Sequence, residues 1–304
     1  MNEAIKNNED RFFFENIRGE SKEIKEAIEI AKRIAPTDVP VLLKGETGTG
    51  KKLFARAIYN AGSRKNFPFI TINCSAISGD FEKEFFSRIS NFPEISKGFY
   101  NDINLSTIFF DEIGEMNFTR QTKLLRAFET NFIVNPGDYK PAGVNVRIIT
   151  ATNKNIEKEI EKNNFRKELY YRIGVVKIEI PPLRKRRDDI EPLAEFFIRD
   201  FSKELNRTIK TIDKDFLDRL REYDFPGNVR ELKNVIERAI ILSDGESLKS
   251  SALPGEFFVH DMQGIPGNNL SEIEKYHILK ILRQNNNNKT RTAETLGIGL
   301  TTLY

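Results

Sequence analysis

The sequence predicts an α/β fold built on a mostly parallel sheet, followed by helical units. Between about Pro40 and Ile180, short β-branched or aromatic runs alternate with amphipathic stretches that are long enough for helices. A glycine-rich segment with the spacing of a phosphate-binding loop, Gly45 to Lys51, follows the first of these runs. After residue 186 the runs typical of strands stop and helical periodicity takes over.

The expected elements follow one another in a simple order. Strands are predicted in the segments PVLLK, PFITIN, STIFFDE, VRIITATN and VVKIEI. Residues 188–245 contain amphipathic segments typical of helices, which we interpret as a small helical subdomain. Pro, Gly and Asn recur through residues 246–269 without a sustained period, which is typical of a linker. A last helical unit is predicted for residues 270–304.

The composition excludes several classes of protein. The chain has 304 residues, 39% hydrophobic and 31% charged, which is enough for at least one substantial core. No apolar run is long enough for a signal peptide or a membrane span, so we expect a cytoplasmic protein. One cysteine, Cys74, and two histidines exclude a disulfide framework and a Cys/His zinc site, so any metal must bind oxygen ligands. A net charge of +3 does not by itself indicate a nucleic acid partner.

The segment KGETGTGKK, residues 44–52, is the first candidate site. Gly45, Gly48 and Gly50 permit backbone conformations in which successive N–H groups point at phosphate oxygens. The helix that should begin near Lys51 adds its positive end, and Lys51 itself would reach the outer phosphates. Lys52 stands where a Ser or Thr hydroxyl usually binds magnesium. The same spacing also arises by chance in glycine-containing loops.

Two carboxylates, Asp111 and Glu112, end the apolar run STIFFDE downstream of this loop. One carboxylate at such a position can hold magnesium through water, and the next can orient an attacking water. Taken alone, the pair also fits a strand that simply ends at the surface. The loop and the pair together favour a nucleotide site.

Further segments follow in a fixed order: GETGTGKKLFARAIYNAGSR, PFITINCSAI, IFFDEIGEM, QTKLLRAFE, VRIITATN, FRKELYYRIGVVKIEIPPLRKRRDDI and FPGNVRELKNVIERAI. Residues 13–245 resemble the central AAA+ ATPase domain of the bacterial sigma-54-dependent transcription activators. The resemblance implies an α/β subdomain at 13–183 and a helical lid subdomain at 184–245, after an N-terminal extension at 1–12. It also implies ATP and Mg²⁺ as cofactors.

The resemblance assigns a role to each matching position. Asn73 would hold the catalytic Glu112 away until the nucleotide state changes, and Asn153 would contact the γ-phosphate region. Asp111 would be the metal ligand. The residues expected to bind ATP are Gly45, Glu46, Thr47, Gly48, Thr49, Gly50, Lys51, Lys52 and Arg230, the last as a second sensor on the lid.

Arg166 and Arg172 match the arginines that reach the ATP of a neighbouring subunit in this family. Guanidinium groups stabilise the charge that spreads over a transferred phosphoryl group, and an arginine supplied in trans can raise the rate about a thousandfold or more. Hydrolysis would then depend on assembly, and the resemblance implies a hexameric ring. Other roles stay open: a solvated helical pair for the two arginines, and capping or surface contacts for Asn153 and Arg230.

The C-terminal segment has the pattern of a helix-turn-helix. Ser271 and Glu274 have the spacing of a capping box, and apolar residues give the first helix a buried face. Ala293, Gly297 and Leu303 follow at the intervals of small residue, turn glycine and apolar residue. The segment resembles a Fis-type DNA-binding domain, and a helical hairpin used only for dimerisation is the alternative.

The expected DNA contacts, at an upstream promoter element, are Thr290, Arg291, Thr301 and Thr302. The chain ends at Tyr304, about one turn into the expected recognition helix. Each lost bidentate base contact costs about 1–3 kcal/mol of discrimination. We therefore expect either a piece of a longer gene product or impaired DNA binding.

Three positions depart from the family pattern. Lys52 replaces the Glu that the family usually has after the loop lysine. Residues 87–96, SRISNFPEIS, lack glycine and are shorter than the family's GAFTGA loop, which grips the sigma factor. Val134 stands where a neighbouring loop has an arginine. These departures predict an active ATPase whose contact with sigma-54 is weak or absent.

Three functions remain open on the sequence. The first is an ATP-driven regulator that binds DNA and remodels RNA polymerase carrying sigma-54. The second is a DNA-binding regulator that uses its AAA+ domain only for assembly or nucleotide sensing. The third is a general AAA+ protein remodeller, which the helix-turn-helix disfavours.

Overall fold

The computed structural model describes residues 12–76, 105–130, 132–133, 142–143, 145–243 and 245–258, and then 271, 274–275, 277–278, 281–282, 285 and 288–299. The chain divides into two compact units, Met1–Ala252 and Leu253–Tyr304. Each unit is described by itself.

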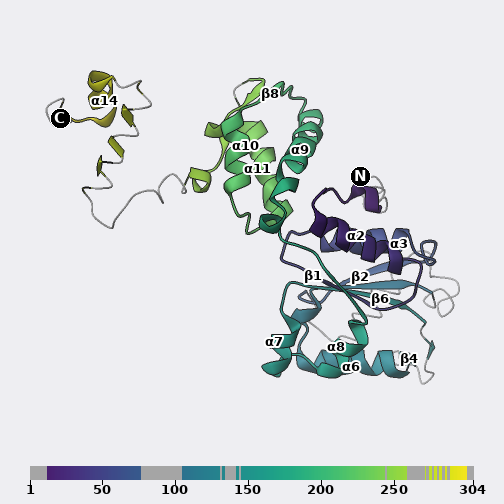
Figure 1. The fold of residues 1–304 in the computed structure, drawn as a ribbon. Coiled ribbons are helices and arrows are strands. Elements are labelled where there is room, and N and C mark those ends of the chain that lie inside the picture. The colour runs from purple at the N-terminus through teal and green to yellow at the C-terminus, as the bar shows by residue number, and fades with distance from the viewer. Residues whose placement is uncertain are drawn as a thin grey trace. The chain divides into compact units, whose positions relative to one another are not determined.

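A parallel sheet with the strand order β2-β3-β6-β1-β7 forms the centre of the α/β subdomain of the first unit (Figure 1). All the predicted strands are confirmed. β1 lies between β6 and β7, with Val41 opposite Ile149 of β6 and Val176 of β7. The strands are β1 Val41–Lys44, β2 Phe69–Asn73, β3 Thr107–Asp111, β6 Arg147–Thr152 and β7 Val176–Glu179.

The sheet is buried on both faces, because alternate residues of each strand enter different cores. Leu42 belongs to one hydrophobic cluster, whereas Val41 and Leu43 belong to the other. One face is covered by α2 Lys22–Ile34 and α3 Lys51–Asn60, and the other by α6 Phe118–Thr130, α7 Ile156–Glu161 and α8 Lys167–Ile173 (Figure 1). The continuous apolar runs of the sequence follow from this double burial.

Short elements complete this subdomain. They are η1 Phe14–Asn16, η2 Ile113–Glu115 and the antiparallel pair β4 Phe132–Ile133 and β5 Ala142–Gly143. The short helices η3 Leu183–Lys185 and η4 Arg187–Asp189 lead into the lid.

The lid consists of α9 Ile190–Glu204, α10 Lys214–Glu222 and α11 Asn228–Leu242, which confirm the predicted helices. A two-residue parallel pair, β8 Thr211–Ile212 and β9 Ser247–Leu248, was not predicted from the sequence. Leu248 is fully buried, and η5 Ser250–Ala252 follows it, so ordered structure extends into residues 246–269, which the sequence presented as a linker. The boundary between the two compact units also falls inside this segment.

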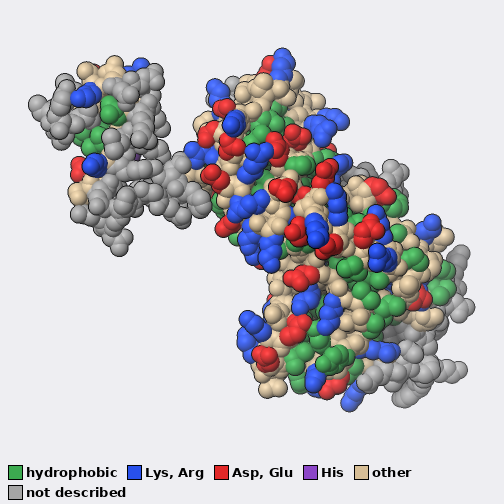
Figure 2. All heavy atoms as spheres, in the orientation of Figure 1, with side chains coloured by type: hydrophobic (Ala, Val, Ile, Leu, Met, Phe, Trp, Pro, Cys, Tyr) green, Lys and Arg blue, Asp and Glu red, His purple; other side chains and the backbone are tan. Residues whose placement is uncertain are grey.

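Acidic and basic side chains are interspersed over the lid on the face shown in Figure 2. That face of the lid therefore offers no uniformly basic surface of the kind that binds a nucleic acid backbone. No helix in the described part of the chain is long and apolar enough to cross a membrane.

In the second unit, η6 Gly255–Phe258 comes first, and residues 271, 274–275, 277–278 and 281–282 are helical. α14 Lys289–Leu296 begins after Asn288, whose side chain accepts a hydrogen bond from the Arg291 N–H. The helix ends at Gly297, which has the left-handed φ of 65° that favours glycine. The turn glycine predicted at this position is confirmed.

Candidate nucleotide site

The candidate residues lie at the carboxyl ends of neighbouring parallel strands, the edge of the sheet where such folds bind ligands. The glycine-rich loop follows β1, Asn153 follows β6, and Asp111 and Asn73 end β3 and β2. Asn73 and Asp111 lie directly opposite each other in the register of β2 and β3. Segments far apart in the sequence thus meet at one edge.

The glycine-rich loop, residues 45–50, turns sharply between β1 and α3. Gly48 and Gly50 have φ values of 81° and 103°, a region that favours glycine. A Cβ on Gly48 would lie 2.1 Å from the carbonyl oxygen of Gly227 in the lid, so this loop and the lid approach backbone to backbone. The loop therefore needs glycine at residue 48 for both reasons.

Lys51 lies at the start of α3 and is 9% exposed. Its ammonium group donates hydrogen bonds to the carbonyls of Gly45, at 2.7 Å, and Glu46, at 2.9 Å. Burial lowers the pKa of Lys51, while the charges of Asp111 and Glu112 oppose this shift. A buried cation whose hydrogen bonds, within the described part of the chain, go to neutral carbonyls would gain from an anionic partner such as a phosphate.

Asp111 and Glu112 face the same region. Burial raises the pKa of Asp111, and the charge of Glu112 raises it further, whereas Lys51 and Lys52 partly offset the shift. Glu112 has a φ of 55° and donates its N–H to the Asp111 carboxylate at 3.1 Å. A left-handed backbone is strained for a residue other than glycine, and such strain is typical of functional sites.

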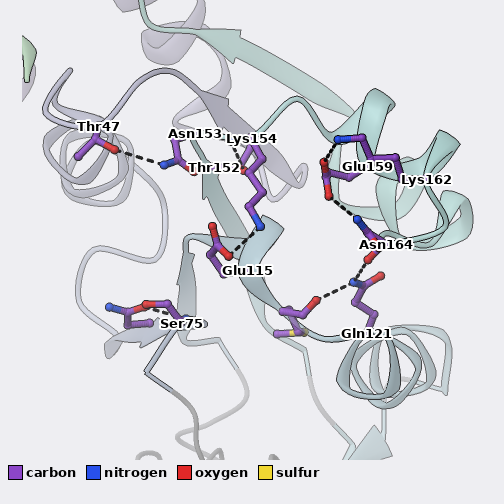
Figure 3. A network of polar contacts seen from close by, with 12 residues as sticks. Thr47, Ser75, Glu115, Gln121, Thr152, Asn153, Lys154, Glu159, Lys162 and Asn164 are labelled. Atoms are coloured by element: carbon purple, nitrogen blue, oxygen red, sulfur yellow. Dashed lines mark hydrogen bonds and ion pairs between the residues drawn. The ribbon is translucent and has the colours of Figure 1, made fainter. Parts of the chain in front are cut away.

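Two asparagines flank this pair. Asn153 donates from its amide to the Thr47 hydroxyl at 3.2 Å, which links the end of β6 to the glycine-rich loop (Figure 3). The amide oxygen of Asn73 accepts hydrogen bonds from the Ser75 N–H, at 3.0 Å, and from the Ser75 hydroxyl, at 2.7 Å. The amide oxygen of Asn73 is thus directed at Ser75 in this structure.

The lid is fastened to the loop by polar contacts. Arg184 forms a bidentate ion pair with Glu46, one of whose hydrogen bonds is 2.7 Å, and this contact lowers the pKa of Glu46. Asn228, fully buried at the start of α11, accepts the Leu183 N–H at 2.7 Å and donates to the Thr47 carbonyl at 3.0 Å. Arg230 also lies beside the loop, because its Cβ is 3.2 Å from the position of a Cβ on Gly48.

Arg166 and Arg172 contact α6 instead of the loop. The Arg166 guanidinium stacks on the ring of Phe118 at 3.9 Å, and Arg172 donates to the Phe128 carbonyl at 2.9 Å. Both arginines therefore contact the same helix. A role toward a neighbouring subunit stays a prediction.

The family descriptions that match the chain cover nearly all of it. Residues 17–179 match the sigma-54 interaction domain, residues 184–266 the AAA+ ATPase lid domain, and residues 269–304 the bacterial regulatory proteins of the Fis family. The chain belongs to the sigma-54 interaction domain family.

Several members of the family can be compared with it. UacR of Escherichia coli K12, whose name describes a sigma-54-dependent transcriptional regulator, is 36% identical over 99% of this chain and 55% of its own length. ZraR of Klebsiella oxytoca, a transcriptional regulatory protein, is 34% identical over 94% of this chain and 67% of its own. NtrX of Brucella abortus in complex with ATP superposes with a TM-score of 0.68 at 29% identity, over 94% of this chain and 67% of its own. The chain thus spans about half to two thirds of the length of these relatives.

Two residues of this sigma-54 interaction domain and its lid were missed in the sequence. Arg184 and Asn228 hold the glycine-rich loop, but their partners lie 138 and 181 positions away. The only local signal was Asn228 after Pro226 and Gly227, a combination typical of a turn with a left-handed residue. Asn228 has that conformation, with a φ of 54°.

Two groups of predicted residues lie elsewhere. Thr290 and Arg291 are exposed in the first turn of α14, in the second unit. Thr301 and Thr302 lie outside the described residues, as do Val134 and the segment 87–96. Predictions about these positions are therefore not addressed by the structure.

The carboxylates at this edge of the sheet fit a metal ion that is shared with a phosphate ligand. In the described part of the chain, no three His, Cys, Asp or Glu side chains are grouped closely enough to hold a metal ion alone. Magnesium commonly binds through one or two carboxylates together with the phosphates of its substrate. Asp111, whose pKa is raised by burial and by the charge of Glu112, fits that arrangement next to the glycine-rich loop.

Proposed function

We propose that this chain is an ATP-driven regulator of bacterial transcription, which binds and hydrolyses ATP with Mg²⁺ in a ring of subunits. Its second unit binds DNA upstream of a promoter, and its motor acts on RNA polymerase that carries sigma-54. The protein would therefore act in the cytoplasm, where its DNA and RNA polymerase partners are. The observation that carries the proposal is the meeting of the loop, Asp111, Glu112 and Asn153 at one sheet edge in a chain with a sigma-54 interaction domain.

The residues of the chain have distinct tasks in this proposal. Lys51 leaves the carbonyls of Gly45 and Glu46 and turns to the phosphates, exchanging neutral partners for charged ones. Glu112 orients the attacking water, and Asn153 reports the outer phosphate to the loop through Thr47. Arg230 also senses the nucleotide, from the lid.

Asp111 is the residue that would hold Mg²⁺. When bound, the ion neutralises charge that develops on the phosphate oxygens. Burial of the Asp111 carboxylate makes a cation favourable at this position. Lys52 supplies no hydroxyl ligand, so the protein contributes fewer direct ligands than an ordinary phosphate-binding loop.

Arg166 and Arg172 act on the ATP of the neighbouring subunit. Each must first leave its contact on α6, with Phe118 or with the Phe128 carbonyl. These contacts hold both side chains against α6 until a neighbour offers an anionic partner. Turnover should therefore require assembly.

The first experiment measures ATP turnover per subunit against protein concentration. We expect turnover to rise with concentration, and Glu112→Gln to bind ATP but not hydrolyse it. Glu115→Gln is the matched control, because Glu115 lies one turn further on and pairs with Lys154 at 2.7 Å. Turnover that is independent of concentration, or that persists in Glu112→Gln, would refute the proposal.

A second candidate function is favoured by residues 87–96. Because this segment has no glycine and is shorter than the loop of the family, the motor could serve assembly or nucleotide sensing without sigma-54. A photo-cross-linker at Phe92, in a complex with ADP and aluminium fluoride, separates the two functions. Capture of sigma-54 supports polymerase as the target, and its absence alongside normal turnover supports the second function.

A further inference from the structure

The side chain of Gln121, in the first turns of α6, is fully buried and makes three hydrogen bonds. Figure 3 shows the one that it makes with Asn164. Its amide nitrogen donates to the Met116 carbonyl at 2.7 Å and to the Asn164 carbonyl at 2.9 Å. Its oxygen accepts the N–H of Arg166 at 2.8 Å. A primary amide is the only ordinary side-chain group that supplies two donors and an acceptor at one point.

The three partners belong to two different functional segments. Met116 closes η2, the turn that begins directly after Glu112 at the end of β3. Asn164 and Arg166 belong to the loop that enters α8 and carries the first candidate arginine. Gln121 therefore joins the segment behind the catalytic carboxylate to the segment that presents the arginine.

The same turn of α6 also holds the side chain of Arg166. Phe118, three residues before Gln121, stacks under the guanidinium at 3.9 Å. The backbone and the side chain of Arg166 are thus fixed by two residues on one face of α6. A small rotation or shift of α6 would move the arginine with it.

The other side of the loop is anchored independently. The Glu159 carboxylate in α7 accepts hydrogen bonds from the Asn164 amide, at 2.9 Å, and from Lys162, at 3.4 Å (Figure 3). Its carbonyl also accepts the N–H groups of Asn164 and Phe165. Loss of Gln121 should therefore displace the loop relative to β3 and α6 without detaching it from the domain.

We propose that Gln121 is a positioning residue. It fixes the position from which Arg166 reaches the ATP of the neighbouring subunit, and it couples that position to the Glu112 segment of the same subunit. This inference rests on the proposed function, because it requires hydrolysis between subunits. Gln121 itself touches neither nucleotide nor metal. It acts through the two segments that it joins.

The test uses assemblies of two kinds of subunit. Gln121→Met keeps the length of the side chain and removes all three hydrogen bonds. Alone, it should bind a fluorescent ADP analogue within about twofold of wild type and assemble normally, while kcat falls at least about tenfold. Glu112→Gln subunits cannot hydrolyse ATP but offer an intact Arg166. When they are mixed with Gln121→Met subunits, turnover per Gln121→Met subunit should rise at least about fivefold above that of Gln121→Met alone.

Two controls define the result. Arg166→Ala mixed with Glu112→Gln should show the same rescue, because its defect lies in the arginine that it offers. Thr122→Val removes the neighbouring hydrogen bond from the Thr122 hydroxyl to the Phe118 carbonyl and should leave turnover unchanged. If Gln121→Met does not assemble, Gln121→Glu carries the test, because it keeps the acceptor for Arg166 and loses both donors.

Three outcomes decide against the inference or its basis. Wild-type turnover in Gln121→Met overturns it. Rescue of Arg166→Ala but not of Gln121→Met also overturns it, because the defect then lies in the variant's own site. If Arg166→Ala alone keeps full turnover, the proposed hydrolysis between subunits fails, and that failure is distinguishable from the other two.

Discussion

The contact between Asn228 and the glycine-rich loop gives the sharpest test of how the lid is held. Asn228→Ala removes the acceptor of the Leu183 N–H, in a buried hydrogen bond, and the donor to the Thr47 carbonyl, in a part-buried hydrogen bond of an exposed residue. Loss of the acceptor leaves the Leu183 N–H without a partner and should lower the free energy of unfolding by about 1–3 kcal/mol. Loss of the donor should cost less, because water can replace it at the Thr47 carbonyl. Alanine at a φ of 54° adds about 1–2 kcal/mol.

The expected loss in the free energy of unfolding is therefore about 2–5 kcal/mol for Asn228→Ala. Asn228→Gly separates the two terms, because glycine adopts this φ without strain and should recover about 1–2 kcal/mol relative to alanine. Urea unfolding followed by far-ultraviolet circular dichroism measures the free energies. Amide hydrogen exchange at Leu183 reports the lost hydrogen bond directly.

Two results would refute this reasoning. An alanine variant within about 0.5 kcal/mol of wild type would show that the Leu183 N–H finds another partner. A glycine variant no more stable than the alanine variant would show that the backbone at residue 228 relaxes, so that its conformation carries no strain.

Three further predictions concern the loop and its surroundings. Gly48→Ala should weaken binding of ADP at least about tenfold, because the new Cβ meets the Gly227 carbonyl, whereas Gly50→Ala meets nothing closer than 3.9 Å and should cost less in a titration. Lys52→Glu should lower the Mg²⁺ concentration for half-maximal ATP turnover about two- to tenfold, because it removes a cation that acts on the metal carboxylate; an unchanged Mg²⁺ requirement would contradict this. Burial opposes ionisation of Glu157, but hydrogen bonds from Tyr170 and Lys44 outweigh it and hold its pKa at about 2. Since the folded-state pKa lies below the usual 4.5, Glu157 stabilises the fold above that pH and loses the effect as pH falls toward 2. Glu157→Gln should destabilise at pH 7 and match wild type near pH 2; an equal difference at both pH values in urea unfolding would contradict the assignment.

Much of the site could be predicted because its signals are local. The glycines of residues 45–50 and the apolar strands that lead to Asp111 and Asn153 each have a pattern within a few residues, and the structure brings their ends together. What remained hidden were residues that act through distant partners. Gln121 reads as an ordinary polar position on a helix, and only its burial and three hydrogen bonds distinguish it.

The same holds for Asp189, which reads as one of two exposed acidic residues before a helix. The structure buries it completely and directs it to the Ser21 N–H and hydroxyl at the start of α2, 168 positions away. No periodicity in the sequence indicates such a contact, because capping groups are recognised locally only when they adjoin their helix.

The sequence by itself determined the order of strands and helices, the place of the phosphate-binding loop and the family. It did so because hydrophobic period, glycine spacing and carboxylates at strand ends depend on neighbouring residues. The tertiary structure alone decided that Asn228 and Arg184 fasten the lid to the loop, and that Arg166 and Arg172 rest on α6. Those contacts depend on how separate elements pack, and packing brings together residues that no local pattern relates.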